Sequence, residues 1–371
     1  MTKGLIYREN MEQNSGILVS LTKDDKLYLL FEDLADCYFK CGYILWQYII
    51  DQNGDPRKSD LWPIPTIFLM RQAIELELKA KICKKREEKG GSKKKLSQKL
   101  NKHDLVTLWK YYLAQVGIEE KSTWLFNYLK SINSVDANST IFRYLYEGEL
   151  WKNRKENTLY LDNFHFAEGM IKAYEILKSG VALEEKPAIS DSFFMKGDWQ
   201  EALCYLSYPT KTSKFLIEGE YEKSITGYQE VSDFIYKCNN FDKKEYPLMF
   251  LLRNTLELQL KYFIYRFNGQ DSTNNREFHT HNLEKLWLLI KDETIEKFSD
   301  LRSSIDCVTM FVKRFNELDN NGERFRYPVD KSLSYKINKE YNLSGVINDA
   351  RKTVEFFEYL DFRYDKFLEK E

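Results

Sequence analysis

A nine-residue stretch at 71–79 reads Arg-Gln-Ala-Ile-Glu-Leu-Glu-Leu-Lys, and residues 253–261 read Arg-Asn-Thr-Leu-Glu-Leu-Gln-Leu-Lys. Both stretches place Glu four residues after Arg and Lys four residues after Glu, so the three charges share one face of a helix. A proline lies six residues before each Arg. Because self-similarity of this kind indicates a repeated structural unit, it organises our interpretation of the chain.

Three further blocks recur downstream in the same order and at nearly the same separations. One begins at His103 and again at His281, where each His is followed by Asp or Asn, then Leu, and then by a Leu-Trp pair. The next ends at Asp136 and at Asp319, and an aromatic triplet begins six residues after each Asp. The triplets are Phe142, Arg143 and Tyr144 in the first copy and Phe325, Arg326 and Tyr327 in the second. We therefore predict a tandem duplication.

Length and composition limit the architecture. A chain of 371 residues is expected to hold two domains, and the repeat places them at 1–178 and 212–371 with a linker at 179–211. With 56 Lys and Arg against 57 Asp and Glu, the whole molecule has no net attraction to nucleic acid or membrane. The six scattered Cys, the polar N-terminus and the lack of a long apolar run predict a cytoplasmic protein with no membrane contact.

Apolar residues recur at helical spacing in both copies, and no stretch alternates as a strand would. We predict an all-α fold of two homologous helical bundles that pack as a pseudo-two-fold pair. The repeated stretch lies on a central helix, at about 64–86 and 247–267, whose two apolar sides indicate packing from both directions. Other helices are expected at about 24–50, 122–134 and 162–178 in copy 1, and ending near residues 241, 319 and 362 in copy 2.

The charged ridge of each central helix has two interpretations. It is either a partly buried ion-pair ridge that fixes helix packing, or a polar groove in which Arg71 and Arg253 meet an anionic ligand or phosphate. Exposed ion pairs add little stability, so retention of the ridge in both copies favours burial or use. Arg143 and Arg326 present the same choice between structural clamps and phosphate contacts.

Residues 84–102 form a strongly basic run, with nine Lys and Arg against two Glu. A Gly-Gly-Ser sequence inside the run predicts a mobile loop, whereas the equivalent segment at 268–280 is polar and hardly basic. The loop is either a solvated connection or an electrostatic contact to RNA or DNA phosphates. The side chains singled out for that contact are Lys84, Lys85, Arg86, Lys93, Lys94 and Lys95.

The central helix, the His block and the Phe-Arg-Tyr triplet together resemble the HEPN superfamily, over about three quarters of the chain. The resemblance is to bacterial helical proteins linked to phage defence and toxin–antitoxin loci. Many HEPN proteins are metal-independent endoribonucleases that act as dimers, with a signature of an Arg a few residues before a polar-flanked His. This pairing suits RNA cleavage, because a His can move the proton of a 2′-hydroxyl and an Arg can stabilise the charged phosphorane.

The resemblance implies a site in copy 2, where Arg276 precedes His281 at the expected spacing. In copy 1 the position equivalent to Arg276 is Gln98, so the motif is incomplete there. If the protein is catalytic, His281 is the general acid or base and Arg276 stabilises charge. The residues expected to shape the cleft are Arg71, Arg253, His103, Arg143 and Arg326. Alternatively, His103 and His281 cap or pack the start of a helix.

No other catalytic or cofactor motif is present: the sequence has no Walker loop, dinucleotide-binding turn, nucleophile elbow or zinc-type Cys/His cluster. We therefore expect no cofactor and no metal. RNA is the expected partner, with a protein of the same defence system and a second copy of the chain as further candidates. Two interpretations without catalysis stay open: a protein-interaction module, and a helical module that senses a small anionic ligand between the domains.

Overall fold

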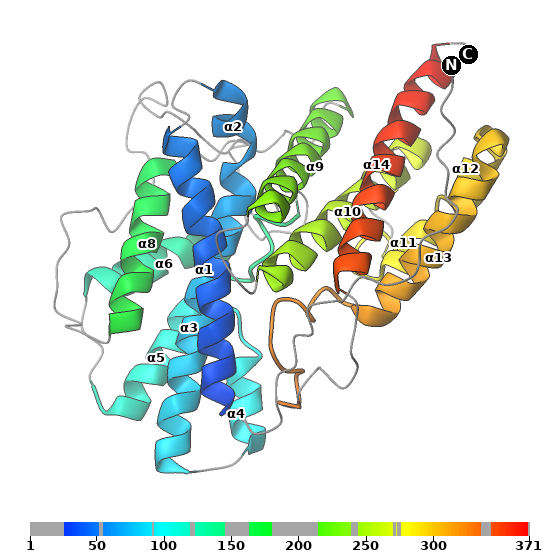
Figure 1. Cartoon of the computed structure of the whole chain (residues 1–371). Coiled ribbons are helices and arrows are strands. Elements are labelled where there is room, and N and C mark those ends of the chain that lie inside the picture. Colours follow the sequence, from blue (N-terminus) through cyan, green and yellow to red (C-terminus); the bar gives the residue numbers. More distant parts are fainter. Residues whose placement is uncertain are drawn as a thin grey trace.

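The computed structural model describes residues 26–51, 55–90, 93–118, 123–144, 163–179, 214–238, 244–269, 272, 276–334 and 343–369. Within these ranges the chain forms helices and no strand, which confirms the all-α fold class. In Figure 1 most helices of the first copy lie on one side of the molecule and most of those of the second copy on the other. None of the described helices is both long and apolar enough to cross a lipid bilayer.

Copy 1 is built around α3 (Pro63–Lys89), which begins with a proline where a missing N–H costs nothing. The most extensive contacts with it are made by α1 (Leu27–Asp51), α5 (Leu105–Val116) and α8 (Asn163–Ser179). Helix α6 (Trp124–Asp136) packs on α5 and α8. Because α3 is buried along most of its length, its position as the inner helix of copy 1 agrees with the two-sided apolar pattern.

Copy 2 repeats this plan around α10 (Glu245–Asn268). Helices α9 (Lys214–Lys237), α11 (Leu283–Leu288) and α14 (Leu343–Leu368) pack on α10, and α13 (Arg302–Leu318) packs on α11 and α14. The helices expected before residues 241, 319 and 362 are therefore present. Two short elements separate α11 from α13: α12 (Lys291–Lys297) and η3 (Ser299–Leu301).

A short helix, α4 (Lys93–Leu100), lies where we predicted a loop, and another short helix, α2 (Pro56–Leu61), precedes α3. Helix α3 also continues to Lys89, so the prediction of a mobile loop at 84–102 is wrong. Helix α3 ends at Lys89 and α4 begins at Lys93, and burial of Leu96 and Leu100 anchors α4 to the protein. The linker expected at 179–211 lies, apart from its first residue, outside the described residues.

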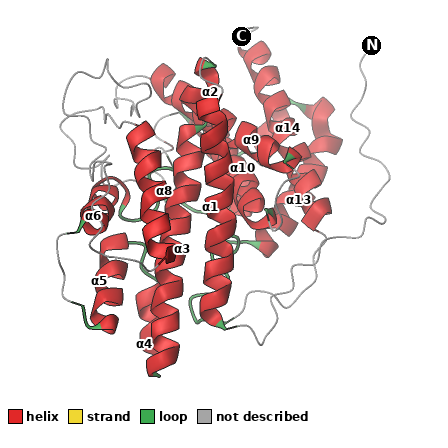
Figure 2. Ribbon diagram, turned by 60° about the vertical axis from the view of Figure 1, so that its left-hand side comes forward, coloured by secondary structure: helices red, strands yellow, loops and turns green. Residues whose placement is uncertain are grey.

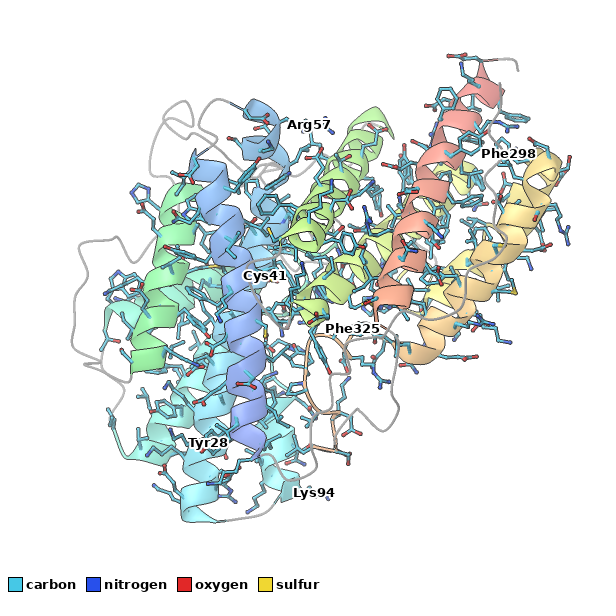
Figure 3. The ribbon with its side chains drawn as sticks, viewed as in Figure 1. Tyr28, Cys41, Arg57, Lys94, Phe298 and Phe325 are labelled. Carbon is cyan, nitrogen blue, oxygen red and sulfur yellow. The ribbon has the colours of Figure 1, made fainter. Side chains whose placement is uncertain are left out.

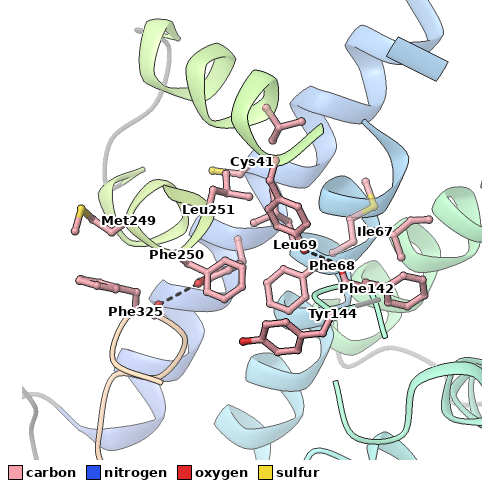
Figure 4. Close-up of a cluster of buried hydrophobic side chains, with 14 of the residues drawn as sticks. Cys41, Ile67, Phe68, Leu69, Phe142, Tyr144, Met249, Phe250, Leu251 and Phe325 are labelled. Carbon is pink, nitrogen blue, oxygen red and sulfur yellow. Dashed lines mark hydrogen bonds between the residues drawn. The ribbon is translucent and has the colours of Figure 1, made fainter. Parts of the chain in front are cut away.

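The two copies share one apolar core, because their buried apolar side chains form a single continuous cluster. Within this cluster the ring of Phe68 on α3 stacks on that of Phe250 on α10, with centroids 4.4 Å apart (Figure 4). These rings occupy equivalent positions, three residues before the Arg of each repeated stretch. Around them α9 packs on α2 and α3, and α1 packs on α10; Figure 2 shows α9 and α10 beside α1.

We expect Phe68→Ala and Phe250→Ala each to lower the free energy of unfolding by about 3–5 kcal/mol, because each leaves a cavity between the copies. In a double-mutant cycle the two changes should be coupled by about 0.5–1.5 kcal/mol, since each ring loses the same stacking partner. Urea unfolding of the four proteins measures both values. Phe362→Ala is the control, because that ring is 54% exposed. Strictly additive losses would show that the two rings do not stabilise one another.

Candidate functional site

The carboxylate of Glu75 lies at the centre of a buried charge network in copy 1. It accepts from Arg71 Nη1 at 2.7 Å and from Lys79 Nζ at 2.7 Å, one helical turn to either side. Arg71 also forms an ion pair with Asp136, in which Arg71 Nε lies 3.1 Å from Asp136 Oδ2. The side chains of Arg71 and Glu75 are 0% exposed. The i,i+4 ridge predicted from sequence is thus a buried ion-pair network and not an open groove.

His103 lies at the edge of this network, immediately before α5. Its Nδ1 is 2.9 Å from Glu75 Oε1, and its backbone carbonyl accepts from Arg71 Nη2 at 2.9 Å. Asp104 caps α5 by accepting from Thr107 N at 2.6 Å, which fixes the start of the helix. His103 is therefore held through both its side chain and its backbone, and the capping residue is its neighbour.

The network is completed by Tyr327, which comes from copy 2. Its hydroxyl donates to Glu75 Oε1 at 2.7 Å and lies 3.0 Å from His103 Nδ1. Arg326 supports this tyrosine by donating to its hydroxyl oxygen at 2.9 Å. Gln72 on α3 accepts from Arg326 Nη2 at 3.2 Å and donates to the Arg326 carbonyl at 3.0 Å. The site around His103 is thus built from both copies of the repeat.

Copy 2 contains the corresponding network around Glu257. This carboxylate pairs with Arg253 at 2.6 Å and Lys261 at 3.1 Å, and its Oε1 is 2.9 Å from His281 Nδ1. Tyr144, from copy 1, donates to Glu257 Oε2 at 3.1 Å. The Phe-Arg-Tyr triplet of each copy therefore reaches into the site of the other.

The triplets are anchored in the same crossed manner at their first residue. Tyr38 on α1 donates to the carbonyl of Phe325 at 3.0 Å, and Tyr228 on α9 donates to the carbonyl of Phe142 at 2.6 Å. Figure 3 labels Phe325 where the 325–334 segment lies between the two groups of helices. Each triplet is thus bound by the first helix of the opposite copy before its Tyr reaches the opposite Glu.

The two sites differ in how the Arg and Tyr of the triplet are held. Position 72 is Gln and hydrogen-bonds Arg326, whereas the equivalent Asn254 is one methylene shorter. Neither amide atom of the buried Asn254 has a hydrogen-bond partner among the described residues. Tyr144 donates to Glu257 Oε2, whereas His281 contacts Oε1; Tyr327 and His103, in contrast, share one oxygen of Glu75. The Tyr144 ring also stacks on the His281 ring, with centroids 5.0 Å apart.

Burial and charge leave the two His side chains as the accessible edge of these networks. The His103 and His281 side chains are 28% and 34% exposed, against 0% for the Glu residue each one contacts. Burial by itself raises the pKa of both Glu75 and Glu257, but the adjacent Lys, His and Arg lower it more, so both carboxyls have a pKa well below their usual range. Burial lowers the pKa of His103, and the Glu75 charge offsets this only in part.

The structure places the other predicted site residues as follows. Arg253, Arg143 and Arg326 are buried and bonded internally, like Arg71, which favours the structural interpretation of all four. Arg276 lies exposed on a turn at 276–279, while the Nδ1 of His281 contacts Glu257. The joint action of Arg276 and His281 in catalysis stays a prediction.

The basic side chains singled out from sequence lie on the last turns of α3 and on α4. Lys84, Lys94 and Lys95 are exposed, and Lys85 and Arg86 are partly buried. Lys85 pairs with Glu88 at 2.8 Å. Of Lys93 the structure describes only its place as the first residue of α4. The basic run is therefore presented by two helices and not by a loop.

Sequence reasoning missed the partners of the two His residues. It treated Glu75 and Glu257 as members of a packing ridge, and it did not join Tyr144 and Tyr327 to either His. The signal was the recurrence of Glu, His and Tyr in the same order in both copies. Which copy each Tyr serves could not be predicted, because sequence order does not show that the triplets cross.

A pocket of about 30 Å³ opens beside His103, with room for roughly two water molecules. Its lining includes Lys79, Asn101, Tyr327 and Lys331. Within the described residues, no three His, Cys, Asp or Glu side chains gather as a metal site would require. The pocket is too small for a nucleotide, so a large ligand would meet the His103 ring at the surface.

Comparison of the chain with models of protein families, with curated proteins and with solved structures finds no match. The resemblance to HEPN proteins therefore stays an expectation based on the residues themselves.

We expect Glu75→Gln to lower the free energy of unfolding by about 3–5 kcal/mol, because it leaves the charge of Lys79 buried without its carboxylate partner and leaves Arg71 paired with Asp136 alone. Asp306→Asn is the matched control, since the pair of Asp306 with Arg302 is more than half exposed and exposed pairs contribute little. Urea unfolding at neutral pH measures both. Equal effects of the two substitutions would contradict the proposed role of the buried network.

Stability should fall in two steps as the pH is lowered. The unfolded chain binds protons more tightly than the folded chain at His103 and at Glu75 and Glu257, so protonation favours unfolding. The His103 contribution is lost as the pH falls below its ordinary pKa of 6.5, and the Glu contributions as it falls below 4.5 toward their folded values. Urea unfolding between pH 8 and about pH 2 tests this. His103→Asn should flatten the first step, and it should leave the Glu257 part of the second step unchanged because His103 does not contribute to the lowered pKa of Glu257.

Proposed function

We propose that the chain is a HEPN-type RNA-binding protein that cleaves RNA without a metal ion. The Glu75–His103 and Glu257–His281 pairs would be its acid–base centres. The observation that supports this most is that each His ring forms the partly exposed edge of a buried network, with its Nδ1 2.9 Å from a buried carboxylate. A carboxylate in that position fixes the tautomer and orientation of the ring, as in other Glu/Asp–His catalytic pairs.

The chemistry follows from that hydrogen bond. An ionised Glu accepts only, so Nδ1 of His103 must donate, and Nε2 of the neutral ring is then the basic nitrogen. Because burial lowers the His103 pKa, the ring is neutral at neutral pH and can take the proton of a ribose 2′-hydroxyl. The 2′ oxygen then bonds to phosphorus and the P–O5′ bond breaks. The 5′ oxygen leaves with its electron pair and takes up a proton, giving a 2′,3′-cyclic phosphate and a 5′-hydroxyl.

The proposal includes a pseudo-two-fold pairing of the two copies. The contact of each Phe-Arg-Tyr triplet with the site of the other copy supports this pairing. HEPN ribonucleases act as dimers. In this chain each site receives a Tyr hydroxyl from the other copy, Tyr144 at Glu257 and Tyr327 at Glu75, so the two copies would take the place of the two subunits of a dimer. The resemblance extends the proposal to a role in bacterial defence or a toxin–antitoxin pair. Growth arrest on expression, relieved by substitution of both His residues, is what that role requires.

A second candidate is a protein-interaction module without catalysis. It is favoured by the internal bonding of Arg71, Arg253, Arg143 and Arg326, which leaves these four guanidinium groups buried. In this interpretation the networks only hold the two copies together.

The decisive test is RNA cleavage by the wild-type protein and by the double variant His103→Asn with His281→Asn. Asn can keep a donor near the position of Nδ1 but cannot act as a base, so folding should be retained while cleavage falls by about 10²–10⁴-fold. EDTA should have no effect, and the products should carry 2′,3′-cyclic phosphate ends. Circular dichroism and thermal unfolding confirm that the variant is folded.

Three results would contradict the catalytic proposal. Cleavage that survives in the folded double variant would place the chemistry elsewhere. RNA binding without cleavage by the wild type would leave a non-catalytic RNA-binding role. Absence of both would favour the protein-interaction module.

A further inference from the structure

A basic surface lies next to the His103 site. It consists of exposed side chains on the last turns of α3, on α4 and just after it: Lys84, Lys89, Lys94, Lys95, Lys99 and Lys102. Figure 3 labels Lys94 at the end of copy 1 away from α2, where α4 lies. The last four of these lysines form no ion pair with a described residue, so their charge is not neutralised within the described part of the chain.

Helix α4 directs these charges outward and ends at the pocket beside His103. Leu96 and Leu100 face the core, at 7% and 3% exposure, which leaves Lys94, Lys95 and Lys99 on the solvent side. Leu100, Asn101 and His103 all line the pocket. The basic surface and the accessible edge of the Glu75–His103 pair therefore belong to one short segment of the chain.

Copy 2 holds α4 in this position. Ser97 Oγ and Asn101 Nδ2 both donate to the backbone carbonyl of Lys331. The segment that contains Lys331 also contains Tyr327, whose hydroxyl contacts Glu75 and His103. One segment of copy 2 thus fixes both the basic helix and the proton-transfer pair beside it.

The His281 site has no corresponding basic segment. The sequence that precedes His281, at 268–280, contains one basic and two acidic residues, where 84–102 contains nine basic and two acidic residues. Single-stranded RNA is attracted to a protein mainly through its phosphates, so this difference in charge decides which site a strand approaches.

We propose that single-stranded RNA docks on the basic surface of α3 and α4 and meets the protein at His103, so that the two sites have different roles. This inference rests on the proposed RNA-binding function and names the half of the molecule that receives the strand. It reverses the expectation from the Arg276–His281 motif, which placed the strand at copy 2.

Binding of a fluorescein-labelled 20-nucleotide oligouridine, measured by fluorescence anisotropy over a range of salt, tests the surface. Neutralising Lys94, Lys95, Lys99 and Lys102 to Gln should weaken binding at least tenfold at low salt. If these lysines contact about four phosphates, the slope of log affinity against log salt should shrink by about 3, since each contact contributes roughly 0.7 for a single strand. The matched control removes four exposed charges from copy 2: Lys285, Lys313, Arg314 and Lys366, each to Gln.

A second measurement locates the strand without relying on activity. An oligonucleotide with 4-thiouridine and 2′-deoxy sugars is photocrosslinked to the wild-type protein, and the crosslinked peptides are identified by mass spectrometry. We expect peptides from 84–112. Where cleavage is observed, His103→Asn should reduce it at least tenfold more than His281→Asn does.

Three results would overturn the inference: unchanged binding in the α4 variant, an equal loss in the copy 2 control, or crosslinks at 268–290. Each of these is compatible with RNA cleavage and would leave the proposed function standing. Failure of the wild-type protein to bind RNA at low salt would instead remove both.

Discussion

The two buried carboxylates, Glu75 and Glu257, are the constraint on which the rest of the structure depends. A carboxylate without exposure is tolerable only if its charge is neutralised and its oxygens are hydrogen-bonded. Here an Arg and a Lys, one turn to either side on the same helix, supply the charge. The remaining hydrogen bonds come from a His at the start of another helix and from a Tyr of the other copy. Each carboxylate thereby joins elements that are far apart in sequence.

This requirement explains why the two copies form one body. A copy alone would lack the Tyr that bonds its Glu and the first-helix Tyr that holds its own triplet. Tyr38 and Tyr228 bind the Phe carbonyls of the opposite triplets, and Phe68 stacks on Phe250 between them. The hydrogen bonds of the buried polar groups and the packing of the apolar rings therefore both lie at the interface between the two copies. The buried Asn254, whose amide has no described partner, is a place where the second copy has diverged from this pattern.

Much of the fold could be predicted from periodicity. The central helices and their burial on two sides follow from local rules of spacing. The suggestion that His103 and His281 cap a helix was wrong, because Asp104 and Asn282 occupy the capping positions. The prediction of a loop at 84–102 failed because Gly and Ser were given more weight than Leu96 and Leu100, which anchor α4. The site was predicted less well. Recurrence identified the Arg and the His, but a short Arg-to-His motif drew attention to Arg276, whereas Glu257 is the contact that the structure gives His281.

The sequence was sufficient to predict the all-α class, which the structure confirms, and to identify the residues that recur in both halves: an Arg, a Glu, a Lys, a His and a Tyr in each. These depend on spacing along a helix, which the sequence records directly. Only the tertiary structure decided that Tyr327 belongs with Glu75 and Tyr144 with Glu257. It also decided that the Arg residues are internal and that the basic helix lies beside His103. Such pairings depend on which surfaces meet when two bundles bury a shared core, and contacts between segments more than 100 residues apart are not encoded in local spacing.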